Sequence, residues 1–431
     1  MSSFYNMAKT RIVAGIELGS SKVVTLIAQV QVDPVSFTTS INIVGVASVE
    51  SKGVKKGQIV DIEEAVEATI ASVEAAERMA GYNLDSAYIA LGGAHVSSQN
   101  SHGVVAVSDP SGEVSPDDVE RAIEAASAIS LSSSRELIHV LPREFAVDGE
   151  SGVKDPAGMS GVRLEVDTHI ITASSAAIKN LKKAVNEVGV NIDGLVFSGL
   201  AASESVLTKT EKELGCVLVD IGGGTTSVAA YIDGALSYSG VIPIGARNVT
   251  NDLAIGLRVS LESAEKIKVA LSDDAKKKNK VKVTGESDQL ELKSLGVDEI
   301  KKVSKKTLVE GIIRPRLNEI FTMIRIELER ATLINKIPAG AIITGGGAET
   351  VGVTDSAKRM MSLPVRIGVP KGVGGLIDDV INPAFAVPIG LILFGTKQQP
   401  NERLTSLAKR IKLPSGGFVG KLVDSIRDLL P

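Results

Sequence analysis

The chain has 431 residues, which at roughly 150 residues per domain predicts two or three domains. Hydrophobic residues make up 44% of it and charged residues 23%, an ordinary globular composition that excludes a disordered or collagen-like chain. Because 47 basic and 51 acidic residues leave a net charge of −4, and aromatic residues are only 3%, we expect no nucleic acid as a partner.

Cysteine usage and apolar runs indicate the compartment. Cys216 is the only cysteine, so the chain forms no internal disulfide and suits a reducing compartment. The start of the chain carries no apolar stretch typical of a signal peptide. The longest apolar run, 384–394, is well short of the ~20 residues that a membrane-spanning helix needs. We therefore expect a cytoplasmic protein with no spanning segment.

The first part of the chain predicts three strands followed by a helix. Two β-branched runs joined by a short Gly/Ser turn indicate a hairpin over 11–32, and the apolar run 41–49 adds a third strand. Asp61 precedes Glu64 by three residues, which is capping-box spacing, and apolar residues then recur at helical period until Gly81.

The segment 86–165 predicts an inserted α+β module. It holds strand-like pieces at 87–91 and 137–147, and a helix whose start is marked by Ser115 and Pro116. Regular elements then resume, with a strand expected over 166–172 and a helix over 176–188.

An internal repeat is the most informative pattern. A strand, an acid and a glycine turn recur some 200 residues apart, so that Glu17 matches Asp220 and Gly19 matches Gly222, with the return strand shifted by one residue. This duplication predicts two similar lobes. Beyond the repeat we expect a helix over 249–270, a lysine-rich solvated stretch over 272–306, and a long helix over 308–334 interrupted at Pro315.

The glycine turns suit phosphate. Such a turn presents backbone N–H groups to an anion, and an acid at the end of the preceding strand can hold a Mg²⁺-bound water. The ordinary alternative, that a Gly-rich turn only closes a hairpin, holds equally well for either turn alone. The duplication and a third cluster after a strand, Gly345–Gly346–Gly347, favour nucleotide binding. No P-loop motif occurs, and the four histidines lack metal-ligand spacing.

Taken together, the three glycine motifs resemble the two phosphate motifs and the adenosine motif of the actin and Hsp70 ATPase superfamily. Within it, the chain resembles the FtsA family of bacterial cell-division proteins over nearly its whole length, most clearly at 54–61, 86–99, 138–147, 195–207, 241–252 and 366–377. The resemblance implies an α/β actin-like ATPase fold with two ribonuclease-H-like lobes, an inserted subdomain IC and a C-terminal amphipathic helix.

The resemblance also implies a division of the chain. The expected parts are subdomain IA at 1–85 and 166–200, IC at 86–165, IIA at 201–245 and 316–395, IIB at 246–315, a linker at 396–414 and a membrane-targeting helix at 415–431.

Site residues follow from the same resemblance. Glu17 and Asp220 would position Mg²⁺ and the attacking water, mostly through bound water. Phosphate contacts are expected from Gly19, Ser20, Ser21, Lys22, Gly222, Gly223, Gly224, Thr225 and Thr226. Adenosine would be held by Glu262, Lys266, Gly345, Gly346 and Gly347. The alternative for Glu262 and Lys266 is an i,i+4 ion pair on the surface. Since the superfamily usually carries aspartate where Glu17 stands, we expect weak ATPase activity at most.

The last residues carry an apolar stripe at helical spacing, formed by Phe418, Val419, Leu422, Val423, Ile426, Leu429 and Leu430. A terminal helix docked on the protein's own core would also explain it. The polar stretch before it favours a detached helix on a membrane surface instead.

The resemblance to the FtsA family implies a peripheral protein on the cytoplasmic face of the membrane at the division site. Such a protein binds ATP with Mg²⁺, forms filaments, tethers filaments of the tubulin-like protein FtsZ and recruits later division proteins. The C-terminal peptide of FtsZ would meet the second lobe, with Arg316 as a candidate contact. The alternatives are a PilM-like scaffold of pilus assembly and an actin-fold small-molecule kinase.

Overall fold

The computed structural model describes residues 10–33, 38–280, 288–297, 302–376 and 380–398, with side chains omitted over 274–280. The chain separates into two units, 1–395 and 396–431. The expected membrane helix, and the expected linker beyond residue 398, lie outside the described residues. Within the described part, no helix is both long enough and apolar enough to cross a membrane.

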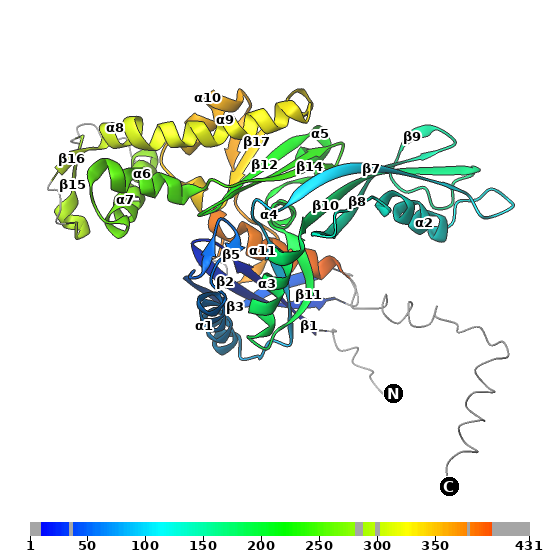
Figure 1. Ribbon diagram of the computed structural model, residues 1–431, viewed down its shortest axis with the longest axis horizontal. Coiled ribbons are helices and arrows are strands. Elements are labelled where there is room, and N and C mark those ends of the chain that lie inside the picture. The colour runs from blue at the N-terminus through cyan, green and yellow to red at the C-terminus, as the bar shows by residue number, and fades with distance from the viewer. Residues whose placement is uncertain (1–9, 34–37, 281–287, 298–301, 377–379, 399–431) are drawn as a thin grey trace, which may run out of the picture. The chain divides into compact units, whose positions relative to one another are not determined.

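The first lobe is built on a six-stranded sheet with the order β11-β6-β1-β2-β3-β19 (Figure 1). Its strands are β1 Thr10–Leu18, β2 Lys22–Val32, β3 Thr39–Glu50, β6 Ser86–Leu91, β11 Asn191–Phe197 and β19 Gly374–Gly375. The strands β1, β2 and β3 are antiparallel neighbours, whereas β6 pairs parallel with β1 and β11 pairs parallel with β6. The predicted hairpin and third strand are confirmed.

Helices cover both faces of this sheet. α1 (Ile62–Ala80) and α3 (Ser175–Asn186) pack on one face, and α11 (Ala386–Lys397) packs Ile389 against Val13 and Val24 on the other. The predicted start of α1 is confirmed, because the Asp61 side chain accepts a hydrogen bond from the Glu64 N–H at 3.1 Å. Its predicted end is also confirmed at Gly81, whose φ of 72° closes the helix.

The inserted module has its own sheet, β7-β10-β8-β9, covered by α2. Its elements are β7 Ser97–Ala106, α2 Pro116–Ser127, β8 Arg135–Val147, β9 Glu150–Val153 and β10 Arg163–Ser174. The predicted start of α2 is confirmed as a reciprocal capping box between Ser115 and Asp118. Hydrogen bonds from Ser115, and further ones from Ser108 and Arg121, hold the pKa of buried Asp118 well below its usual range.

The second lobe repeats the topology of the first. Its sheet has the order β14-β13-β12-β17-β18, with antiparallel pairs on one side of β12 and parallel pairs on the other, as around β1. The strands are β12 Cys216–Ile221, β13 Thr226–Ile232, β14 Ala235–Ile242, β17 Ala341–Thr344 and β18 Val365–Ile367. The predicted two-lobed duplication is therefore confirmed at the level of strand order.

Helices and short elements complete the second lobe and the connections. The helices are α4 Ser198–Val206, α5 Lys209–Leu214, α6 Ala246–Leu257, α7 Leu261–Lys280, α8 Lys305–Leu308, α9 Arg314–Arg330 and α10 Val353–Met361. The short strands are β4 Val54–Lys55, β5 Gln58–Ile59, β15 Gln289–Glu291 and β16 Lys302–Ser304. The remaining turns of helix are η1 Leu292–Leu295, η2 Val309–Ile313, η3 Ile334–Lys336, η4 Gly346–Glu349 and η5 Pro383–Phe385.

Two helix predictions were wrong in detail. The helix expected over 249–270 is two helices, because Arg258 takes a left-handed conformation with φ of 57° and the Ser260 hydroxyl accepts from the Ser263 N–H to start α7. The helix expected over 308–334 contains a π-helical turn just before Pro315 and ends at Arg330. Proline cannot donate a backbone hydrogen bond and its ring crowds the preceding turn, so the regular α-helical bonding is interrupted here.

Two segment boundaries also differ from those expected. β6 was placed in the inserted module, but it is a central strand of the first sheet, so the module begins after it. The segment 316–395 was placed wholly in the second lobe, but β19 pairs with β3 and α11 packs on the first sheet. The chain therefore returns to the first lobe before residue 396.

Candidate functional site

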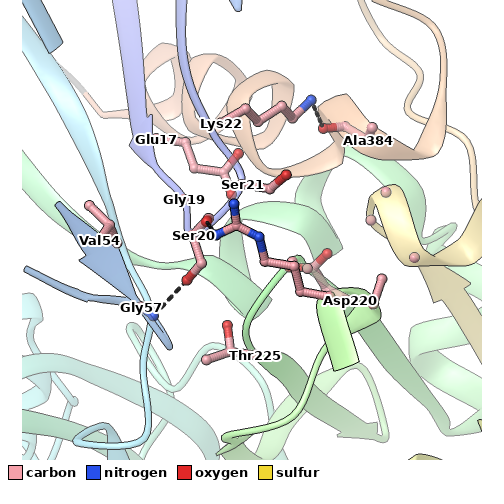
Figure 2. Close-up of a pocket in the computed structure, with 18 of the residues that line it drawn as sticks. Glu17, Gly19, Ser20, Ser21, Lys22, Val54, Gly57, Asp220, Thr225 and Ala384 are labelled. Atoms are coloured by element: carbon pink, nitrogen blue, oxygen red, sulfur yellow. Dashed lines mark hydrogen bonds between the residues drawn. The ribbon is translucent and has the colours of Figure 1, made fainter. Parts of the chain in front are cut away.

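A cavity of about 760 Å³ lies between the two lobes. Its walls come from the β1–β2 turn, the β12–β13 turn, the loop after β17, the first residues of α6 and one face of α7. Figure 2 shows the two turns approaching each other, with Gly19, Ser20 and Ser21 on one and Thr225 on the other. All three sequence-predicted glycine motifs therefore contribute to a single site.

The two turns are equivalent in length and bonding. The last paired residues are Leu18 with Val23 in the first hairpin and Ile221 with Thr226 in the second, so each loop has four residues. The Gly19 N–H donates to the Lys22 carbonyl at 3.0 Å, and the Gly222 N–H donates to the Thr225 carbonyl at 2.9 Å. The one-residue shift of the return strand expected from the sequence is therefore wrong. The loops have equal lengths, but their last residues, Lys22 and Thr225, differ in type, so the sequence alone did not show the match.

Glycine is required in the second turn because the first turn presses on it. A Cβ on Gly223 would lie 2.8 Å from the Ser21 Cβ, and a Cβ on Gly224 would lie 2.8 Å from the Ser20 Oγ. The Ser20 Oγ also accepts a hydrogen bond from the Gly57 N–H at 2.9 Å, so the β4–β5 hairpin supports the first turn from outside. Packing alone thus explains two of the three glycines.

The backbone of these turns presents unbonded donors. Gly222 and Gly223 direct their carbonyls to the N–H groups of Ala246 and Arg247, at 2.9 and 2.8 Å. Since a trans peptide is planar, with its C=O and N–H antiparallel, the N–H groups of Gly223 and Gly224 point away from α6.

Among the described turn residues, the N–H groups of Ser20, Ser21, Gly223, Gly224 and Thr225 donate to no protein acceptor. Donors gathered in this way form a nest that suits an anion.

Two carboxylates adjoin the turns. Burial, and to a lesser extent the Asp220 carboxylate, raises the pKa of Glu17 to about 7, against an opposing effect of Lys22. Burial likewise raises the pKa of Asp220 to about 7, again opposed by Lys22. The positive charge of Lys22 therefore does not offset the burial of the Glu17 and Asp220 carboxylates. A divalent cation held mostly through water fits this donor set, since Mg²⁺ takes one or two carboxylates and keeps several waters. Within the described residues no cluster of three potential metal ligands occurs.

Lys22 and Gly345 connect the site to the end of the first unit. The Lys22 Nζ donates to the Ala384 carbonyl at 2.8 Å (Figure 2) and lies 4.0 Å from the centre of the Phe385 ring. The Gly345 N–H donates to the Pro383 carbonyl at 3.0 Å, so one short segment touches both lobes. Gly345 itself has φ of 82°, and a Cβ there would lie 2.3 Å from Asp220 Oδ1.

Several expected site residues line the cavity and others do not. Among the residues described, the cavity wall includes Glu17, Gly19, Ser20, Ser21, Lys22, Asp220, Gly222, Gly223, Thr225, Glu262, Gly345, Gly346 and Gly347. The wall omits Gly224, which packs against Ser20, and Thr226, whose hydroxyl donates to the Ile244 carbonyl at 2.8 Å. It also omits Lys266, which forms the i,i+4 ion pair with Glu262 at 2.8 Å.

Arg316 is engaged inside the second lobe. Its guanidinium donates two hydrogen bonds to Asp252, at 2.7 and 3.0 Å, and a third to Glu319. The sequence analysis missed two other cations in the cavity wall, Arg247 and Lys268. Lys268 could have been found from its i,i+3 spacing to Glu265 on the cavity side of α7, whereas no local pattern marks Arg247.

Comparison with known proteins identifies the family. A model of the SHS2 domain inserted in FtsA matches residues 93–172, and a model of cell division protein FtsA matches residues 217–390. The chain is 38% identical to cell division protein FtsA of Pseudomonas aeruginosa over 389 residues, covering 90% of each protein. It is 34% identical to that of Escherichia coli K12 over 428 residues, covering 97% of this chain and 98% of the relative. The chain belongs to the FtsA family.

Solved structures place this FtsA-family chain in the actin-like ATPase fold. PilM, in the PilM–PilN type IV pilus biogenesis complex, aligns with a TM-score of 0.61 at 17% identity, covering 90% of this chain and 99% of PilM. MreB5 of Spiroplasma citri bound to AMPPNP aligns with a TM-score of 0.51 at 14% identity, covering 93% and 99%. At such identities both likenesses show the fold alone, so the PilM-like alternative gains no support over the FtsA family.

Proposed function

We propose that this protein binds ATP with Mg²⁺ in the cavity between its lobes. The observation that carries the proposal is the pair of equal turns whose unbonded N–H groups lie beside two carboxylates. Two actin-like neighbours support it, since the S. citri MreB5 structures are described as bound to ADP and to AMPPNP.

Different residues of the chain would bind the phosphates, the cation and the base of the nucleotide. The turn N–H groups would bind phosphate oxygens, and Glu17 and Asp220 would hold Mg²⁺ through its waters and position the attacking water. Bound Mg²⁺ would neutralise charge on the phosphates and on the two carboxylates. The glycines after β17 let a flat base approach the backbone closely, with Glu262 at the edge of the same wall.

At the level of the cell, we propose that the protein forms filaments and tethers FtsZ filaments to the inner face of the cytoplasmic membrane, recruiting later division proteins. Membership of the FtsA family supports a role in cell division, and the apolar stripe within 415–431 supports the tether. Buried halfway into a membrane surface, seven such side chains supply on the order of 5 to 10 kcal/mol before ordering costs.

The tether is tested by cosedimenting FtsZ with lipid vesicles in ATP and Mg²⁺. The intact protein should carry FtsZ into the vesicle pellet, and a variant lacking 415–431 should not. A point variant on the apolar face, Leu422→Gln with Ile426→Gln, should behave like the truncation. The matched polar-face variant, Asp424→Asn with Ser425→Ala, should behave like the intact protein. Equal FtsZ in all pellets would refute the tether.

Arg316 remains our candidate contact for the FtsZ peptide, and a peptide bound there would have to replace existing bonds of its guanidinium. Because its guanidinium already bonds Asp252 and Glu319, an acidic peptide must compete with these carboxylates. Binding of the FtsZ C-terminal peptide should therefore be stronger for Asp252→Ala than for the unaltered protein, provided that Arg316 is the contact. Titration calorimetry with the synthetic peptide measures this.

A further inference from the structure

Arg247 joins the two turns across the cleft. Its backbone N–H donates to the Gly223 carbonyl at 2.8 Å, in the second-lobe turn. Its side-chain Nη1 donates to the Ser20 carbonyl, also at 2.8 Å, in the first-lobe turn. A single residue near the start of α6 therefore fixes the spacing of two turns that lie more than 200 positions apart in the sequence.

The charge of Arg247 is not neutralised by the protein. Within the described part of the chain, no carboxylate lies within 4.0 Å of its guanidinium. The two lysines of the cavity wall are engaged, since Lys22 donates to the Ala384 carbonyl and Lys268 pairs with Glu265 at 2.7 Å. Guanidinium has five donors in a planar fork, and the bond to Ser20 uses one of them.

Arg247 also lies in the wall of the cavity that both turns line. It lines the main cavity and a second hollow of about 500 Å³ beside the β4–β5 hairpin. Its side chain is exposed, so a ligand reaches the guanidinium without displacing any part of the fold. The position suits an anion bound at the turns and not a neutral base, which the glycines after β17 would hold.

We propose that Arg247 is the closing and phosphate-sensing residue of this site: it holds the two turns together through Ser20 and donates its remaining N–H groups to the phosphates. This inference rests on the proposed nucleotide function and names a residue that sets ligand preference within it. Because the same guanidinium serves the turn and the ligand, a polyphosphate reinforces lobe closure and adenosine does not.

The experiment compares Arg247→Ala, Arg247→Lys and a control, Arg325→Ala. Arg325 is a suitable control because its Nη1 donates to the Met360 carbonyl at 3.2 Å within the second lobe, away from the cavity. Dissociation constants for ATP and for adenosine are measured with Mg²⁺ present. Amide exchange of the peptides covering 15–24 and 54–60 is measured without nucleotide, which reports turn closure independently of binding.

For Arg247→Ala we expect ATP affinity to fall about 10- to 100-fold, the range for losing charge-assisted hydrogen bonds to phosphate. Adenosine affinity should change less than about twofold, because adenosine has no phosphate for the guanidinium to bind. Arg247→Lys should recover part of the ATP affinity, and exchange at both peptides should rise in Arg247→Ala but not in Arg325→Ala.

Equal losses for ATP and adenosine, or ATP affinity within twofold of the unaltered protein, would overturn the phosphate role. Unchanged exchange would overturn the closing role. An unaltered protein that binds no nucleotide refutes the proposed function instead, and the exchange measurement then still decides the closing role.

Discussion

Glu17 places a carboxylate where burial disfavours its charge, so removing that charge should stabilise the ligand-free protein. The pKa of Glu17 is raised from its ordinary 4.5 to about 7. Each tenfold change in proton affinity corresponds to about 1.4 kcal/mol, so holding Glu17 ionised in the folded protein costs about 3 kcal/mol. Glu17→Gln relieves this cost while keeping the shape of the side chain.

The sign follows from proton linkage. Below pH 4.5 the carboxyl is protonated in both the folded and unfolded states, so its cost is absent. Between pH 4.5 and about 7 the folded state binds more protons than the unfolded state, so stability falls as pH rises, and the full cost is present above that range. The gain from Glu17→Gln should therefore be large at pH 8 and small at pH 5.

Thermal unfolding in EDTA, without nucleotide, measures the effect. An unfolding entropy of about 2 cal/mol/K per residue over the roughly 370 residues that the structure describes gives about 0.8 kcal/mol per degree, so Tm should rise by about 4 °C at pH 8. The matched control is Glu67→Gln, which alters an exposed glutamate on α1. A gain of equal size at pH 5 and pH 8, or a lower Tm at pH 8, would refute the reasoning. With Mg²⁺ and ATP present, the stabilisation by ligand that Glu17→Gln loses should exceed the stability that it gains by removing the buried charge.

Three further outcomes are expected. Gly345→Ala should lower the free energy of unfolding by about 3 kcal/mol and abolish nucleotide binding, because backbone strain and a steric clash coincide there. Gly352→Ala, at a position with φ of 81° and open space, should lower it by only about 1 kcal/mol, as measured by chemical denaturation. Similar losses in the two variants would contradict the clash. Asp118→Asn should cost about 2 kcal/mol and raise amide exchange mainly within 93–172, since several hydrogen bonds converge on this buried carboxylate. A double-mutant cycle on Arg316 and Asp252 should return a coupling of about 1 kcal/mol; zero coupling would show the pair to be incidental.

Elements with local signals were predictable from the sequence. The helix between Asp61 and Gly81 and the helix after Ser115 carry their start or stop signals within a few residues of each end. The hairpin turns were also recognisable, because glycine at a strand end has few other uses. These signals depend on backbone donors and φ angles, which neighbouring residues determine.

Elements whose partners lie far away in sequence were not predictable. β6 resembles any short apolar strand, and only its parallel pairing with β1 and β11 places it in the first sheet. α11 is apolar on all sides because it is buried between the first sheet and α4, so no amphipathic period indicates which lobe it joins. The same limit hid Arg247, whose role exists only when two distant turns meet.

The two turns have equal backbones but unequal side chains, and the packing explains why. The first turn carries Ser20, Ser21 and Lys22, and its side chains fill the space that a Cβ on Gly223 or Gly224 would need. The first turn can bear the side chains of Ser20 and Ser21 only because the second has glycine at the facing positions 223 and 224. The first turn thereby contributes a hydroxyl anchor and a cation, while the facing glycines contribute backbone donors alone. A duplicated hairpin thus becomes an asymmetric clamp, and Arg247 supplies the side chain that these glycines lack for a bond to the first turn.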